Sequence, residues 1–299
     1  MTSAYGTAPR DPASQDRGSH DPVMVGEVLA YLGDREEVLD CTLGAGGHAE
    51  ALLDAGVGRV VGIDRDPEAI ELATARLARF GPRFTTLRTR FSALPIDPPV
   101  DGVLLDLGVS SMQLDRAERG FSYREPGPLD MRMGPDATTA MDLVNELPES
   151  ELANVLFEFG EERRSRRVAA AINRARGRSR ITTTEELAAI VAGALGSRPG
   201  GPHPARRTFQ ALRIAANDEL DELRTALPRA TEALRPGGRL VVIAYHSLED
   251  RIAKRFLIGE ERLRILTKKP LVPSEDEVRR NPRARSAKLR AAERLVEAA

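Results

Sequence analysis

Short apolar runs separated by polar and glycine-rich turns dominate the first part of the chain. Four such runs, each of a length suited to a buried strand, lie at residues 38–41, 59–63, 84–88 and 100–105. A helical pattern begins at His48 after the first run, and another covers 69–80 behind Asp66 and Pro67, an N-cap followed by proline. Strands that alternate with helices predict a parallel, doubly wound α/β sheet.

The alternation stops near residue 112 and gives way to helical spacing. Leu152, Val155, Leu156 and Phe159 form one helical stripe. Thr182 and Glu185 have the spacing of a capping box before another helix. Apolar residues three and four apart from 209 to 227 predict one long helix, and a strand pattern returns at 239–243.

This pattern predicts the organisation of the chain. We expect a disordered tail at 1–19, because that segment is rich in Pro, Gly and Ser and has no apolar period. The α/β domain is discontinuous, built from 20–112 and 206–299. Between its halves lies a mostly helical insertion, 113–205, expected to recognise RNA or another substrate.

Composition narrows the class of protein. Apolar residues make up 41% of the 299 residues and charged residues 30%, which is ordinary for a globular chain. No apolar run is long enough to span a membrane, and the first 20 residues lack the apolar core of a secretory signal. The single cysteine, Cys41, excludes an internal disulfide and fits a cytoplasmic location. The four histidines are scattered, so we expect no metal site.

The net charge of −1 hides two strongly basic stretches. Residues 161–180 hold eight Arg against two Glu, and residues 262–294 hold eleven Arg or Lys against four acids. One interpretation is a track for a nucleic-acid backbone, because guanidinium groups bind phosphate in a bidentate manner. The other is a solvated helix face held by pairs of side chains one turn apart.

The first turn after a strand has the composition of a cofactor loop. Residues 40–48 run from Asp40 through Gly44, Gly46 and Gly47 to His48. A dinucleotide such as NAD would need a G-x-G-x-x-G turn for its pyrophosphate, and this pattern is missing. S-adenosylmethionine (SAM) has no phosphate, and its sulfonium and ammonium groups favour a nearby acid such as Asp40. The pattern therefore favours SAM over NAD.

The ends of the next strands carry matching groups. Asp64 follows the second strand, where a carboxylate can accept both ribose hydroxyls, and Phe91 follows the third, where a ring can pack on adenine. Asp106 ends the fourth strand. Each has a plainer interpretation as a cap or core residue, but all lie at the strand ends where open α/β sheets bind ligands. Residues 234–240 add a turn and strand typical of class I methyltransferases.

Longer motif blocks go beyond this general pattern. They lie at 101–115, 118–122, 127–133, 203–214, 245–251 and 281–290. Together they closely resemble the RsmH family, also called MraW, over about 20–294. Mild departures are Cys41, Ala45, Met112 and Tyr245, where the family often has Gly, Gly, Pro and Phe.

The resemblance implies a fold, a reaction and a set of contacts. The fold is the class I, Rossmann-like SAM-dependent methyltransferase sheet, and the reaction is direct in-line methylation of the N4 amine of cytosine 1402 in 16S ribosomal RNA, near the decoding centre. The implied partner is the small ribosomal subunit, with a homodimer left open. The implied SAM contacts are Gly46, Gly47, His48, Asp64, Phe91, Asp106 and Gln113.

Roles in catalysis rest on chemistry. Asp106 is the first candidate for orienting the amine or the cofactor, and His246 for lining the base pocket, with a structural hydrogen bond as its alternative. Phe121, Tyr123 and Tyr245 are candidates for stacking on the base or for the core. Three rival functions stay open: a SAM enzyme acting on DNA or a small molecule, a SAM-binding regulator without catalysis, and an NAD oxidoreductase.

Overall fold

A single seven-stranded sheet organises the computed structural model, which describes residues 22–135, 137–196 and 200–296; the tail expected at 1–19 lies outside them. The strands are β1 (Glu37–Asp40), β2 (Arg59–Asp64), β3 (Phe84–Arg88), β4 (Val100–Asp106), β5 (Leu234–Ala244), β6 (Leu263–Ile265) and β7 (Lys288–Arg294). Their order is β3-β2-β1-β4-β5-β7-β6. The first five run parallel, whereas β7 is antiparallel to β5 and β6 to β7. The predicted class I methyltransferase sheet is confirmed.

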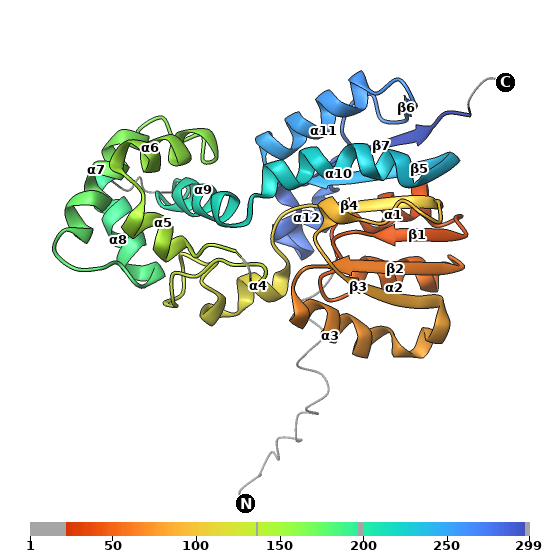
Figure 1. The fold of residues 1–299 in the computed structure, drawn as a ribbon, viewed down its shortest axis with the longest axis horizontal. Helices are drawn as coiled ribbons and strands as arrows, with labels where there is room; N and C mark the ends of the chain where they lie inside the picture. Colours follow the sequence, from red (N-terminus) through yellow and green to blue (C-terminus); the bar gives the residue numbers. More distant parts are fainter. Residues whose placement is uncertain (1–21, 136, 197–199, 297–299) are drawn as a thin grey trace, which may run out of the picture.

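Helices cover both faces of the sheet (Figure 1). The helices of the chain are α1 (Val25–Leu32), α2 (Gly47–Asp54), α3 (Pro67–Leu77), α4 (Ser111–Asp115), α5 (Ala140–Glu146), α6 (Glu149–Glu158), α7 (Ser165–Arg176), α8 (Thr184–Leu195), α9 (Arg206–Asn217), α10 (Glu219–Ala233), α11 (Ser247–Gly259) and α12 (Glu275–Arg280). Neighbouring strand residues point to opposite faces. Val38 therefore packs in the cluster with α1 to α3, while Leu39 packs in the cluster with α10 and α11.

Of the two predicted helix caps, one lies where the sequence indicates and the other lies one residue later. Asp66 caps α3 as predicted, since its Oδ1 accepts the Glu68 N–H at 3.2 Å. The capping box predicted at Thr182 lies one residue later. There Thr183 Oγ1 accepts from the Glu186 backbone N–H at 3.2 Å, and Glu186 Oε2 accepts from the Thr183 backbone N–H at 3.1 Å.

The single long helix predicted across 209–227 is wrong. It is two helices, α9 and α10, because Asp218 adopts a left-handed backbone with φ 54° between them. A residue in this region ends the first helix and turns the chain before the second. The apolar spacing continues through the break, so periodicity alone did not show it.

The basic stretch 262–294, placed outside the sheet from sequence, is partly in it. Residues 263–265 form β6, and 288–294 form the buried strand β7 beside β5. Arg290 is only 7% exposed and donates to Asp250 Oδ1 at 2.7 Å. Arg294 donates to the carbonyls of Thr231 and Glu232. These guanidiniums are structural, so charge counts overstated the surface available for RNA.

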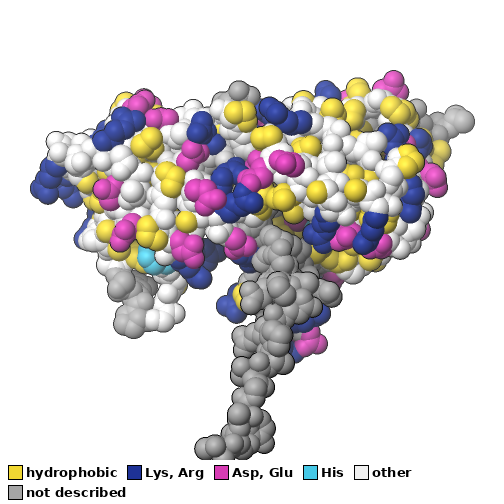
Figure 2. Space-filling model, turned by 90° about the horizontal axis from the view of Figure 1, so that it is seen from below, with side chains coloured by type: hydrophobic (Ala, Val, Ile, Leu, Met, Phe, Trp, Pro, Cys, Tyr) yellow, Lys and Arg dark blue, Asp and Glu magenta, His cyan; other side chains and the backbone are white. Residues whose placement is uncertain are grey.

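A third hydrophobic cluster lies apart from the sheet, in the helical unit of α5 to α9 (Figure 1). Phe209, Ala211 and Leu212 of α9 belong to this cluster, although the predicted insertion ended at 205. We therefore propose that the insertion extends to Asn217. Figure 2 shows cationic and anionic side chains intermixed on one face of the molecule, in keeping with the small net charge. No helix in the described ranges is long and apolar enough to cross a bilayer.

The buried Arg290 of β7 and its partly buried partner Asp250 of α11 make a testable prediction about stability. Arg290→Ala should lower the free energy of unfolding by about 2 kcal/mol, because it leaves Asp250 with only the more distant Lys288, 3.5 Å away. Urea denaturation measures this change. Arg264→Ala is the matched control, since Arg264 pairs with Glu293 on the exposed surface and its loss should cost less than about 1 kcal/mol. Equal losses for the two variants would contradict a structural role for Arg290.

Candidate cofactor and substrate site

A cavity of about 1000 Å³ opens where the carboxyl ends of the parallel strands face the helical insertion. One wall is the turn after β1 and the ends of β2 and β4, with Asp64, Phe91 and Asp106. The opposite wall is formed by the insertion and α9. A third side comes from the segment after β5 and from the C-terminal residues 281–286. The strand-end groups singled out from sequence therefore border one space, apart from Asp40.

Asp64 is held in a fixed orientation at the end of β2. Its Oδ2 accepts the Gly44 N–H and its Oδ1 accepts the Asp66 N–H, both at 2.9 Å. Burial raises the pKa of Asp64, and these backbone donors oppose the rise. Each carboxylate oxygen can accept a second hydrogen bond, and Asp64 lines the cavity, so the group suits a pair of neighbouring hydroxyls.

The turn that carries Asp64 is fastened to the insertion through Asp66. Asp66 Oδ2 accepts from Arg119 at 2.7 Å and from Gln113 Nε2 at 3.4 Å. Arg119 also donates to the Arg132 carbonyl at 3.0 Å. Gln113, predicted as a cofactor contact, lines the cavity and is 6% exposed, so its amide serves both the wall and this network.

The glycines of the turn after β1 face two different sides: two line the cavity and one packs against the core. Gly44 and Gly47 line the cavity, and Gly44 has a left-handed φ of 51°. Gly46 does not line it; with φ 80°, it faces α3, where a Cβ would lie 3.0 Å from Leu77. Glycine is therefore required at position 46 by the backbone conformation and by the packing of α3, not by contact with the cavity. Gly44 was not among the predicted cofactor contacts. Its N–H donates to Asp64, and it lines the cavity beside that carboxylate.

His48 lines the cavity, whereas Asp40 lies behind the turn. Asp40 is 1% exposed, and burial raises its pKa to about 6. The His48 Nε2 must carry a proton, because it lies 2.9 Å from the Val23 carbonyl, which can only accept. Burial lowers the pKa of His48, and its Nδ1 lies 3.5 Å from Asp106 Oδ2.

Asp106 is the most perturbed carboxyl of the site. Burial raises its pKa to about 7, the hydrogen bond from Tyr245 opposes this, and the charge of Glu249 adds to the rise. The Tyr245 hydroxyl donates to Asp106 Oδ1 at 2.9 Å. This bond depends on a residue that departs from the family's usual Phe. Asp106 therefore exchanges its proton near neutral pH within a wall of the cavity.

His246 takes the structural hydrogen bond that was its alternative interpretation, and it also lines the cavity. It caps α11, its Nδ1 accepting the Glu249 N–H at 3.5 Å. Its Nε2 lies 3.1 Å from Glu249 Oε1. A catalytic role for His246 stays a prediction.

A charged cluster surrounds His246 at the far end of the cavity. Ligand-type atoms of Glu219, His246 and Glu249 lie within 4.8 Å of one another. Both Glu219 oxygens are occupied by the guanidinium of Arg213, at 2.8 and 2.7 Å. Burial would raise the pKa of Glu249, but His246 and Arg213 hold it below its ordinary value. Arg213 thus supplies a positive charge beside Glu219 and Glu249, as a bound metal ion would. That the protein holds no metal stays a prediction.

Aromatic rings border the cavity on the insertion side. Tyr123 stacks on His203 with centroids 4.7 Å apart, and meets Phe209 edge-on at 5.7 Å. Phe121 is 6% exposed and belongs to the third hydrophobic cluster while its edge lines the cavity. Of the three predicted stacking residues, Phe121 is chiefly core, whereas Tyr123 and Tyr245 are half-buried against open space.

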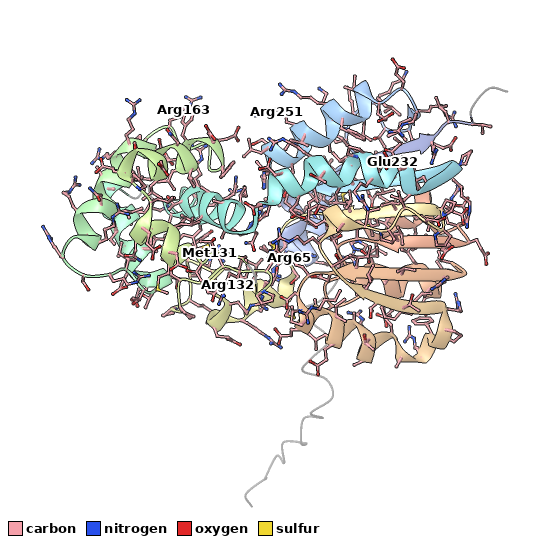
Figure 3. All side chains as sticks on the ribbon, viewed as in Figure 1. Arg65, Met131, Arg132, Arg163, Glu232 and Arg251 are labelled. Carbon is pink, nitrogen blue, oxygen red and sulfur yellow. The ribbon has the colours of Figure 1, made fainter. Side chains whose placement is uncertain are left out.

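Asn217 joins the two sides of the cavity at their seam. Its amide donates to the Met131 carbonyl and accepts from Met133 N–H, both at 2.8 Å. Its own carbonyl accepts from Arg65 at 3.2 Å. Figure 3 shows Met131 and Arg132 facing Arg65 across this boundary. The seam fixes the insertion against the turn after β2.

The chain is similar to known proteins along nearly its whole length. A family model described as the MraW methylase family matches residues 17–295. A "Ribosomal RNA small subunit methyltransferase H" from Azorhizobium caulinodans is 50% identical, with 98% of this chain and 92% of that protein covered. One from Heliobacterium modesticaldum is 49% identical, with 92% and 98% covered.

A solved structure gives a more distant likeness. The putative rRNA-methylase from Clostridium thermocellum has a TM-score of 0.46 at 16% identity, with 92% of this chain and 98% of that chain covered. The family match and the close relatives confirm the resemblance seen in the motif blocks: the chain belongs to the MraW (RsmH) methylase family.

Proposed function

We propose that this protein methylates the N4 amine of a cytosine in small-subunit ribosomal RNA, by direct transfer from SAM, and that the cytosine is the one numbered 1402 near the decoding centre. The observation that carries the proposal is the single cavity that joins the strand-end carboxylates to an aromatic and basic wall. Its relatives are named as methyltransferases of the same ribosomal RNA.

The strand-end half of the cavity fits SAM. Asp64 offers two oriented oxygens to the ribose, and Phe91, half-buried after β3, offers a ring to the adenine. Gly44 and Gly47 leave room for close approach of a ligand. Asp40 Oδ2 is buried and has no hydrogen-bond partner in the described part of the chain, and its negative charge behind the turn suits a cationic ligand. We assign Gly47, Asp64, Phe91 and Asp106 as cofactor contacts, with His48 and Gln113 as part of the wall and Gly46 in support.

The chain's own residues would orient the amine. When bound, SAM supplies a methyl group made electrophilic by the sulfonium. The N4 amine of cytosine is a weak nucleophile, so alignment and acceptance of its N–H hydrogens matter most. Asp106 Oδ1 is fixed by Tyr245, which leaves a lone pair for an amine hydrogen. The same carboxylate, with a pKa of about 7, can hold the proton that the methylated amine releases.

The rival functions differ in what the cavity must accept. A DNA enzyme would act on a base from a duplex, a regulator would bind SAM without transfer, and an oxidoreductase would need a pyrophosphate loop that residues 40–48 do not form. The close relatives are named for ribosomal RNA, which favours the proposal over the first two.

The substrate assignment is tested by methyl transfer. Small ribosomal subunits from cells lacking this protein should accept tritiated methyl groups from SAM, whereas duplex DNA should not. Mass spectrometry of the RNA digest should then show one N4-methylated cytosine at the predicted position. Labelling of another base, or of none, would contradict the proposal.

Asp64 tests the cofactor assignment. Asp64→Ala should weaken SAM binding on the order of 100-fold, because it removes two hydrogen bonds to a charged acceptor at about 1.5 kcal/mol each. Calorimetry measures the affinity, and thermal denaturation checks the fold. Asp54→Ala, an exposed aspartate on α2, is the control and should bind SAM as the wild type does. Wild-type affinity in Asp64→Ala would show that the ribose site is elsewhere.

Asp106 tests the mechanism through pH. Its pKa is raised from 3.8 to about 7, so the carboxylate form dominates only above that pH, and the rate constant at saturating substrates should fall as pH drops below about 7. Tyr245→Phe removes a bond that lowers this pKa, so the profile should move to higher pH. Tyr31→Phe, away from the cavity, should leave it unmoved. If the pH profile of Tyr245→Phe does not shift, the group that controls the pH dependence of the rate constant is not Asp106.

A further inference from the structure

A second cavity, of about 620 Å³, adjoins the substrate end of the first. It lies between the turn after α6, the start of α9 and the C-terminal segment before β7. The two cavities share eight lining residues: Pro202, His203, Arg206, Gln210, Tyr245, His246, Arg285 and Ser286. The two spaces therefore adjoin at these residues, and a ligand longer than one nucleotide has room to extend from the first cavity into the second.

The walls of the second cavity are basic. Five cationic side chains line it, Arg164, Arg206, Arg207, Arg285 and Lys288, against two acids, Glu161 and Glu162. Both acids already have partners: Glu161 Oε1 pairs with Arg251 at 3.2 Å, and Glu162 Oε1 accepts the Arg164 backbone N–H at 2.9 Å. The excess positive charge is left facing the space.

Two of the five cations are free to bind a ligand. Arg164 and Arg207 donate to the carbonyls of Leu195 and Glu161, and Lys288 lies 3.5 Å from Asp250. The guanidiniums of Arg206 and Arg285 form no hydrogen bond or ion pair with any residue that the structure describes. Both are exposed, and both belong to the shared lining, so they stand at the junction of the two cavities.

The basic residues on either side of Arg285 in the C-terminal segment, in contrast, form ion pairs within the protein. Arg283 pairs with Asp115 on α4, and Lys288 with Asp250 on α11. The basic tail that the sequence presents as one run is thus divided by the fold. Arg285 of this segment has no partner among the residues that the structure describes, and Arg206, from a distant part of the chain, lines the same two cavities.

We propose that Arg206 and Arg285 form a phosphate clamp for the target nucleotide, binding the phosphodiester groups that flank the base held in the first cavity. The proposal rests on the proposed function, since it takes the ligand to be RNA. A base drawn out of its stack brings its own phosphates to the mouth of the pocket. Guanidinium groups bind phosphate oxygens in a bidentate manner, and a pair of them at one junction can fix the backbone on both sides of the nucleotide. The second cavity then takes the neighbouring nucleotide.

A small ligand tests the clamp without a ribosome. Cytidine 3′,5′-bisphosphate carries both flanking phosphates, and cytidine carries neither. With S-adenosylhomocysteine present at saturation, the wild-type protein should bind the bisphosphate about tenfold or more tightly than cytidine, as measured by NMR titration. The double variant Arg206→Gln/Arg285→Gln should bind the two equally. The matched control is Arg88→Gln/Arg255→Gln, because neither arginine pairs with a residue that the structure describes and neither lines either cavity. This control variant should keep the preference for the bisphosphate.

Kinetics on small ribosomal subunits give the second readout. The clamp variant should raise KM for subunits about tenfold, with kcat and SAM affinity unchanged, because phosphate contacts position the RNA without touching the reacting atoms. The salt dependence of kcat/KM should become shallower by a logarithmic slope of about 1.4, for two contacts to a single strand.

The outcomes separate the clamp from the proposed function. A bisphosphate preference that survives in the clamp variant, a preference absent from the wild type, or an unchanged salt slope would each overturn the clamp. If the wild type leaves ribosomal cytosines unmethylated, the proposed function fails. Loss of the bisphosphate preference in the clamp variant would still support a phosphate site at the junction.

Discussion

Burial of carboxylates at one edge of a parallel sheet is the constraint on which the rest of the structure depends. Parallel strands all end at the same edge, so Asp40, Asp64 and Asp106 lie there together, Asp40 fully buried and the other two partly buried against the cavity. A buried carboxylate without donors is costly, so the surrounding turns must supply N–H and O–H groups. Asp64 receives two backbone donors, and Asp106 receives one phenol. Burial is the main cause that raises the pKa of Asp106 to about 7, and the single phenol donor opposes this rise.

The insertion completes that edge as well as covering it. Arg119 does not line the cavity, yet it holds Asp66, and Asp66 donates its backbone N–H to Asp64. A residue from the substrate-facing unit is therefore two hydrogen bonds away from the carboxylate assigned to the ribose. Asn217 adds a second tie between the same two parts of the chain. The cofactor half of the cavity and its substrate half share one wall, so neither is built independently.

The sequence was most informative where a short-range pattern has one physical solution. The strands at 59–63 and 84–88 and the cap at Asp66 follow from period, β-branched content and a proline after an aspartate, which act over a few residues. The same reasoning placed Asp64 and Asp106 at one edge, because strand direction alone decides that. It failed at Asp218, since a left-handed residue leaves the apolar spacing on both sides intact.

Long-range pairing was beyond the sequence pattern. Nothing local in 288–294 distinguishes a strand from a basic tail; the segment is a strand because β5 offers it an open edge and because Asp250, 40 residues earlier, neutralises Arg290. Gly46 and Gly44 show the same limit on a smaller scale. Both are glycines in one turn with positive φ, yet only the packing of α3 shows which one faces core and which one faces the cavity.

The direction of the last long strand links the fold to the substrate side of the site. Because β7 is antiparallel to β5, Lys288 pairs with Ala244 at the carboxyl end of β5. The residues just before β7, including Arg283 and Arg285, are thereby delivered to the edge where the cavities open. A parallel strand in the same place would begin at the opposite edge and carry these residues away from it. The antiparallel strand therefore makes one C-terminal segment serve both the sheet and the mouth of the site.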